Sequence, residues 1–194
     1  MPIRELFFHL ITYAIGPQYE KKSIFKDNFV TMKFLLVLAL LSPLFIDAQN
    51  CKLSKETDPY TKETKLSTGF MFFSGASLTI DADSKEVDML FSLEGANHCF
   101  DNNSTAVVHF EGTKIKMNLH NAGTMNCEGL FHFIYKNSVN TTSQLQKLTT
   151  QKISQVVFTG NDKKGITVTL TPKDQELLVS LGTCLVNEAK SLIR

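Results

Sequence analysis

A short apolar run near the N-terminus constrains this chain more than any other feature. Residues 32–48 open with a Met-Lys pair, continue through an apolar core and end in the small residue Ala48. A basic start, a short apolar core and a small residue at the end are the three parts of a secretory signal peptide. We therefore expect export, with cleavage between Ala48 and Gln49.

A membrane-spanning helix is the alternative interpretation of the same run. Its apolar part, residues 34–46, covers 13 positions and contains Pro43, whereas a span requires about 20 apolar residues. Signal peptides normally begin at the initiator Met, yet 31 residues precede Met32. We interpret residues 1–31 as a spurious or unstructured extension and residues 49–194 as a single exported domain.

Cys51 lies close behind the expected cleavage site and raises the question of lipid attachment. A lipoprotein signal requires a small residue directly before the cysteine, and Asn50 does not meet that requirement. The sequence favours an exported protein that is soluble after processing, with lipid attachment to Cys51 as the alternative.

The exported part of the chain has no net charge. Residues 1–48 hold five of the 20 basic and four of the 19 acidic residues, so 15 of each remain in residues 49–194. A neutral domain without a basic cluster has no electrostatic support for nucleic-acid binding. Its 146 residues suffice for one domain with a hydrophobic core.

All four cysteines lie in the exported part, and an even number after an export signal indicates disulfide bonds. Three pairings are possible. We favour Cys99–Cys127, because these residues flank one hairpin, together with Cys51–Cys184, which would join the start of the domain to its last helix. Zinc is the competing explanation, but the close C-x-x-C pairs typical of zinc sites are missing from the sequence.

Alternating apolar and polar residues, typical of half-buried strands, recur through the exported part. They predict strands in residues 77–81, 87–93, 105–120, 129–135, 152–158 and 165–170, and we interpret the apolar stretch 66–73, which contains Thr and Phe, as another. The stretch 105–120 is a hairpin that turns at residues 111–113. Its first strand places Ala106, Val108 and Phe110 on the buried face, and its second strand places Ile115, Met117 and Leu119 there.

The spacing of the apolar residues changes near the C-terminus. Thr171 is a suitable N-cap and Pro172 a suitable first helical residue, and apolar residues then recur at spacings of three and four as far as Leu192. This pattern predicts an amphipathic helix; a shorter one is expected at residues 142–148. The predicted fold is mainly β, an antiparallel sheet arranged as a sandwich or open barrel and closed by the C-terminal helix (α+β by strict count).

Catalytic motifs such as H-E-x-x-H, G-x-S-x-G and the Walker loop are missing from the sequence. The best candidates for chemistry are His109 and Glu111, which share the outward face of one strand, and His120, which ends the neighbouring strand. Facing each other across the hairpin, the three could hold a metal or act as acid and base. We favour the simpler interpretation of a solvated sheet face and expect no cofactor.

Four acidic residues crowd one turn and raise the question of calcium binding: Asp81, Asp83, Glu86 and Asp88. The EF-hand loop requires a glycine at its sixth position and a distant glutamate, and both are missing. We interpret these residues as an acidic β-turn.

Four features of the chain resemble small exported proteins of the Bacteroidetes type. They are the signal that ends in Ala48-Gln49, the early Cys51, the Asp-Pro-Tyr-Thr-Lys turn at residues 58–62 and the helical Leu181-x-x-Cys184-Leu185. The likeness covers most of the exported part and implies a bacterial periplasmic or secreted setting. It assigns no functional residue.

These observations predict an exported, non-enzymatic domain that binds an unidentified protein or small ligand or supports the cell envelope. The alternative is a small hydrolase or metal-binding enzyme with a site near His109, Glu111 and His120.

Overall fold

The computed structural model describes residues 51–95 and 98–193. The expected signal peptide and the extension before it lie outside these residues. The described residues belong to one compact unit, Asn50–Arg194. Its strands are β1 Ser54–Thr57, β2 Thr64–Ser67, β3 Met71–Phe73, β4 Ala76–Ala82, β5 Glu86–Leu93, β6 Thr105–Phe110, β7 Lys116–His120, β8 Leu130–Lys136, β9 Ile153–Thr159 and β10 Gly165–Thr169. Its helices are α3 Ser143–Thr150, α4 Pro172–Ala189 and the short 3-10 helix η2 Lys190–Leu192.

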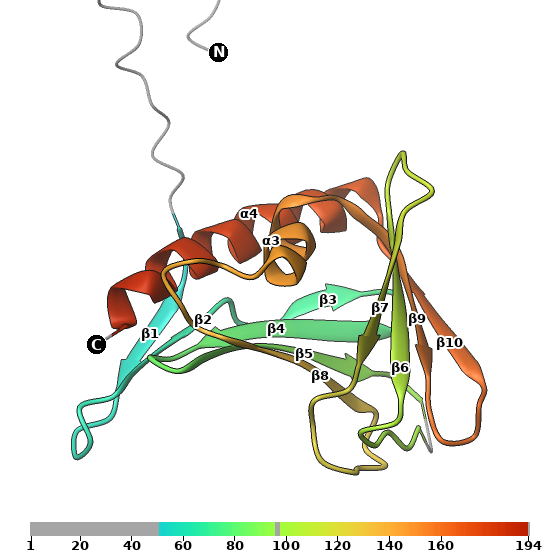
Figure 1. Ribbon diagram of the computed structural model, residues 1–194, viewed down its shortest axis with the longest axis horizontal. Coiled ribbons are helices and arrows are strands. Elements are labelled where there is room, and N and C mark those ends of the chain that lie inside the picture. The colour runs from blue at the N-terminus through green and yellow to red at the C-terminus, as the bar shows by residue number, and fades with distance from the viewer. Residues whose placement is uncertain (1–50, 96–97, 194) are drawn as a thin grey trace, which may run out of the picture. The chain divides into compact units, whose positions relative to one another are not determined.

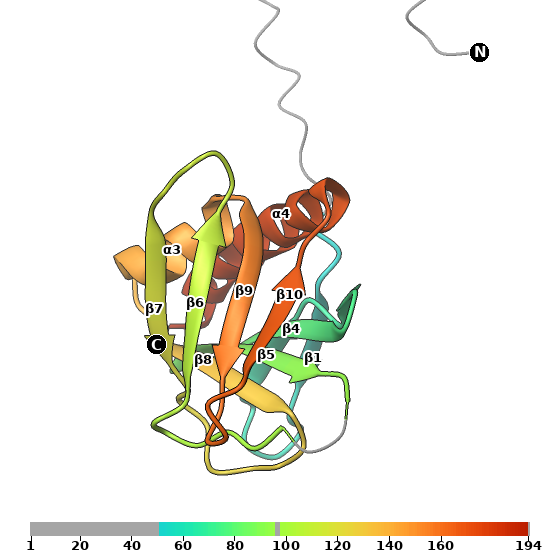
Figure 2. The ribbon, with the colours of Figure 1, turned by 90° about the vertical axis from the view of Figure 1, so that its right-hand side faces the viewer.

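The strands form two antiparallel sheets. One has the order β1-β2-β4-β5-β8, with β3 also paired to β4, and the other has the order β10-β9-β6-β7. Figure 1 shows α4 running along one face of the six-stranded sheet, with α3 beside it, and the four-stranded sheet standing at one end. Figure 2 shows this second sheet nearly face on. The predicted fold class is confirmed, and the sheets remain open.

The hydrophobic core joins the two sheets through a cluster of phenylalanine rings. Phe158 of β9 lies with its ring centroid 5.2 Å from that of Phe91 in β5 and 5.1 Å from that of Phe131 in β8. Phe100, in the segment before β6, adds a fourth ring 5.2 Å from Phe131. All four side chains are fully buried, and each stabilises the fold by about 1.5–3 kcal/mol through burial.

Helix α4 begins as the sequence predicts, but Leu177, which was expected on its packed apolar face, is 42% exposed. The Thr171 hydroxyl accepts from the Asp174 backbone N–H, and the Asp174 carboxylate accepts from the Thr171 N–H at 2.9 Å, which forms a capping box. Gly182 lets the helix approach α3 closely, because a Cβ at this position would lie 3.2 Å from the Thr149 side chain. Thr183 then donates a hydrogen bond to the Thr149 carbonyl.

Three expectations require correction. Strand β1 was not expected, because its four residues carry no apolar alternation. In the structure all four are exposed. The single strand expected at residues 66–73 is divided into β2 and β3, where the Thr68 hydroxyl accepts from the Ile80 N–H in place of a regular ladder. Ile115 is 63% exposed, because the pairing of β6 with β7 ends at Lys116 and leaves it in the connecting loop.

Among the described residues, the helices are too short or too polar to cross a membrane.

Candidate functional site

The four cysteines form the two predicted disulfides, Cys51–Cys184 and Cys99–Cys127. The first joins the start of the described chain to the middle of α4 across 133 residues, with the Cα atoms 6.0 Å apart. The second closes a loop of 28 residues between the segment after β5 and the segment before β8. The described part of the chain therefore contains no free thiol.

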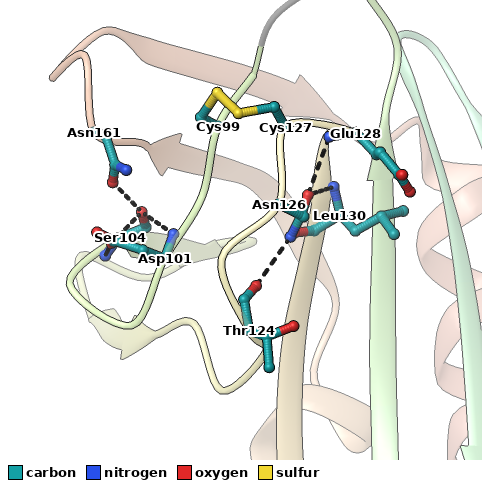
Figure 3. The surroundings of a disulfide bond; sticks show 9 residues. All are labelled: Cys99, Asp101, Ser104, Thr124, Asn126, Cys127, Glu128, Leu130 and Asn161. Atoms are coloured by element: carbon teal, nitrogen blue, oxygen red, sulfur yellow. Dashed lines mark hydrogen bonds between the residues drawn. A yellow bond between two sulfur atoms is a disulfide. The ribbon is translucent and has the colours of Figure 1, made fainter.

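Next to the second disulfide, Asn126 covers part of the edge of β8 (Figure 3). Its side-chain oxygen accepts from the Leu130 N–H at 3.0 Å, and its side-chain nitrogen donates to the Leu130 carbonyl at 2.9 Å. The amide thus satisfies both outward backbone groups of the first residue of the strand, as a neighbouring strand would.

A second group of polar residues in Figure 3 holds the loop before β6. The Asp101 carboxylate accepts from the Asn103 and Ser104 backbone N–H groups and from the Ser104 hydroxyl, at 2.9 to 3.1 Å. Burial alone would raise the pKa of Asp101, but these hydrogen bonds outweigh it and hold the pKa below its ordinary value. The Asn161 side chain, from the turn between β9 and β10, lies 3.3 Å from the Ser104 hydroxyl.

The predicted trio His109, Glu111 and His120 is not brought together by the fold. In the register of β6 and β7, His109 lies opposite Lys116, while His120 lies opposite Thr105 at the other end of the hairpin. Glu111 is exposed in the connecting loop. Four residues of strand separate the two histidines, a distance of about 13 Å, so one metal ion could not bind to both.

The acidic residues at the turn between β4 and β5 have separate structural roles. Asp83 accepts from the backbone N–H groups of Lys85 and Glu86 at 2.7 and 2.9 Å, as a β-turn side chain does. Asp81 forms an ion pair with Lys65 of β2 at 3.1 Å. Residues 51–95 and 98–193 contain no group of three or more His, Cys, Asp or Glu side chains placed to hold a metal.

The sequence did not predict the hydrogen-bonded contact between Asp88 and His132. These residues are 44 positions apart, and the register of β5 with β8 places His132 beside Asp88 on the sheet face turned away from the core. The His132 Nδ1 atom lies 2.8 Å from Asp88 Oδ2. The other Asp88 oxygen is buried and has no hydrogen-bond partner in the described structure. Their positions on the outward faces of two alternating strands were the only signal available in the sequence.

The most unusual surface feature is a pair of exposed aromatic rings at β3. Phe70 and Phe72 are 68% and 74% exposed, with ring centroids 6.1 Å apart and planes inclined by 29°. Gly69, the residue before this pair, lines a groove of about 340 Å³ together with side chains of β1, β2 and β4: Ser54, Glu56, Lys65, Ser67 and Asp81. We refer to the two phenylalanines and this groove as the β3 surface. Its hydroxyl, amino and carboxylate groups beside two apolar rings are suited to binding a ligand.

Comparison with protein-family models, with curated proteins and with solved structures gives no match.

Proposed function

We propose that this protein is an exported, disulfide-bonded binding domain that recognises its ligand through the outer side of the six-stranded sheet. Phe70 and Phe72 of the β3 surface would supply apolar contact, since exposed aromatic pairs are uncommon on surfaces without a binding role. The neighbouring groove would supply hydrogen bonds through groups such as Lys65 and Asp81.

The disulfide between Cys51 and Cys184 carries the proposal of export. Structural disulfides persist in oxidising compartments outside the cytoplasm and are rare within it. This bond lies immediately after the expected cleavage site and connects it to α4, so the folded domain begins where the expected signal peptide ends. The disulfide and the expected signal peptide both favour a compartment outside the cytoplasm.

A binding role explains the polar residues better than hydrolysis does. His109 and His120 lie at opposite ends of their hairpin. The His132 ring has Asp88 as its hydrogen-bond partner, and within the described residues no hydroxyl or thiol donates to the ring as a nucleophile would. The Asp88–His132 pair is therefore best explained as a contact between strands.

Cell fractionation and mass spectrometry test the export part of the proposal. The full chain, carrying a C-terminal tag, is expressed in a bacterium that has a periplasm. We expect the tagged protein in the periplasm or the medium, with Gln49 as its first residue, all four cysteines oxidised and Cys51 free of lipid. A cytoplasmic protein that retains residues 1–48 would contradict export, and an acylated Cys51 would replace a soluble domain with a membrane-anchored one.

A further inference from the structure

Two terminal strands, one from each sheet, border an opening in the fold. β7 is the last strand of the four-stranded sheet, and β8 is the last strand of the six-stranded sheet. Between them lies a cavity of about 210 Å³ lined by both strands and by Gln144 of α3. Figure 1 shows where β7, β8 and α3 lie in the fold.

The chain covers one end of the β8 edge. The odd-numbered residues of β8 form the hydrogen bonds to β5. This follows from two bonds at the ends of the ladder, in which the Leu93 N–H donates to the Gly129 carbonyl and the Asn137 N–H donates to the Lys85 carbonyl. The even-numbered residues therefore direct their backbone groups outward. Leu130 is satisfied by Asn126, as described above. His132 is satisfied by the Asn121 side chain, which accepts its N–H at 2.8 Å, and by the Ala122 N–H, which donates to its carbonyl at 3.0 Å.

The β7 edge has no such cover. The Asn121 N–H donates to the Ser104 carbonyl, so the odd-numbered residues of β7 bond to β6 and the even-numbered residues point away from it. These outward residues are Lys116, Asn118 and His120. In the described structure, the outward N–H groups of these residues donate no hydrogen bond and their outward carbonyl groups accept none. An unpaired edge of this kind is a template for another strand.

The charges around the opening indicate which kind of strand fits. Lys116 of β7 is exposed, and Lys114, also exposed, lies just before β7. Lys136 of β8 lies opposite Glu86 of β5 and adds no net charge. Neither β7 nor β8 contains an acidic residue. This excess of positive charge attracts an acidic segment.

The floor of the opening is partly apolar, and Asn118, His120 and Gln144 are its polar lining residues. Leu119 and Phe133 line the cavity and are 6% and 2% exposed. Tyr135 lines it as well. Side chains of an added strand would alternate between this floor and solvent, so the best segment alternates apolar and acidic residues.

We propose that the free edge of β7 binds an extended acidic peptide segment of a partner protein by strand addition, which gives the four-stranded sheet a fifth strand. The inference gives the proposed binding domain a second site, separate from the β3 surface, and names the class of partner for it. It can fail while the fractionation result stands, because peptide binding and export are measured separately.

Asn118→Pro is the central test variant, because it removes one outward N–H of the β7 edge without removing a bond to β6. Thr167→Pro is its matched control. The Leu170 N–H donates to the Ser154 carbonyl, so Thr167 occupies the equivalent outward position on β10, the other terminal strand of the same sheet. Lys116→Glu tests the contribution of charge.

The probes are two short fluorescent peptides, one alternating Glu with Val and the other alternating Lys with Val. Binding is measured by fluorescence anisotropy at low salt, with protein purified after expression of the full chain. We expect the acidic peptide to bind more tightly than the basic one. Its binding should weaken about three- to tenfold in Asn118→Pro, because one hydrogen bond is lost. Binding should also weaken in Lys116→Glu and remain unchanged in Thr167→Pro.

Amide hydrogen exchange locates the binding. The acidic peptide should slow exchange at Lys116, Asn118 and His120 and leave Thr167 unaffected. Three results would overturn the proposal: failure of the acidic peptide to bind, equal binding of the two peptides, or unchanged binding in Asn118→Pro. Self-association that protects Asn118 as protein concentration rises would also overturn it, in favour of a second copy as the occupant.

Discussion

His132 Nδ1 lies 2.8 Å from Asp88 Oδ2 across two neighbouring strands, and both side chains are 24% exposed. Solvent reaches a contact of this exposure, so its contribution to the free energy of unfolding is small, about 0.2–1 kcal/mol. We expect a double-mutant cycle of Asp88→Asn and His132→Gln, measured by urea unfolding, to give a coupling energy in this range. A coupling of several kcal/mol would show that the pair acts as a buried unit, and the argument for a simple strand contact would then be wrong.

The two disulfides should stabilise the protein to different degrees. In the chain-entropy model, a crosslink stabilises more when it closes a longer loop, and Cys51–Cys184 spans 133 residues whereas Cys99–Cys127 spans 28. We expect replacement of Cys51 and Cys184 by serine to lower the free energy of unfolding by about 4–5 kcal/mol, against about 3–4 kcal/mol for the other pair. Urea unfolding of the two double variants side by side measures the difference. The reverse order would show that native contacts outweigh loop length.

Tyr135 should lose its phenolic proton at a higher pH than an exposed tyrosine does. Burial of its side chain raises the pKa of the phenol from 10.0 to about 12, because the charged phenolate is poorly solvated. Residues 49–194 contain one other tyrosine, Tyr60. In the Tyr60→Phe variant of residues 49–194, we therefore expect a single rise in phenolate absorbance centred near pH 12.

The same shift makes stability depend on pH. The folded protein holds the Tyr135 proton more tightly than the unfolded chain does, so the free energy of unfolding should fall as pH rises from 10 towards 12. In Tyr135→Phe, the part of this decline that is due to the phenol should disappear. A phenol that ionises at the ordinary value in the folded protein would contradict its burial.

The exposed phenylalanines should contribute little to folding. Phe70 and Phe72 are mostly in solvent, whereas Phe100 is fully buried. We expect Phe70→Ala and Phe72→Ala to change the free energy of unfolding by about 0.5 kcal/mol or less, and Phe100→Ala to lower it by about 3–5 kcal/mol. Thermal and urea unfolding provide the comparison. A large loss at Phe70 or Phe72 would give the β3 surface a structural role and weaken the proposal that it binds a ligand.

Much of the secondary structure follows from local patterns. Val87, Met89, Phe91 and Leu93 alternate along β5 and are all buried, because a strand turns every second side chain to the same face. Helix α4 begins at Pro172, since the Thr171 cap and its partner Asp174 are close neighbours in the chain. Both disulfide pairs were also predicted, because the cysteines flank elements whose ends could be located in the sequence.

Features that depend on long-range register could not be predicted. β1 exists because β2 lies beside it, and its four exposed residues carry no pattern of their own. His109 and His120 lie apart because the hairpin pairs Thr105 with His120.

Local sequence is sufficient to define the strand and helix periods and the helix caps, because each depends on residues within a few positions of one another. The tertiary structure was needed for the Asp88–His132 pair, the β3 surface and the open edge of β7. Each of these brings together segments that are distant in the chain, and a shift of a single residue in strand register would move the side chains involved to opposite faces of a sheet.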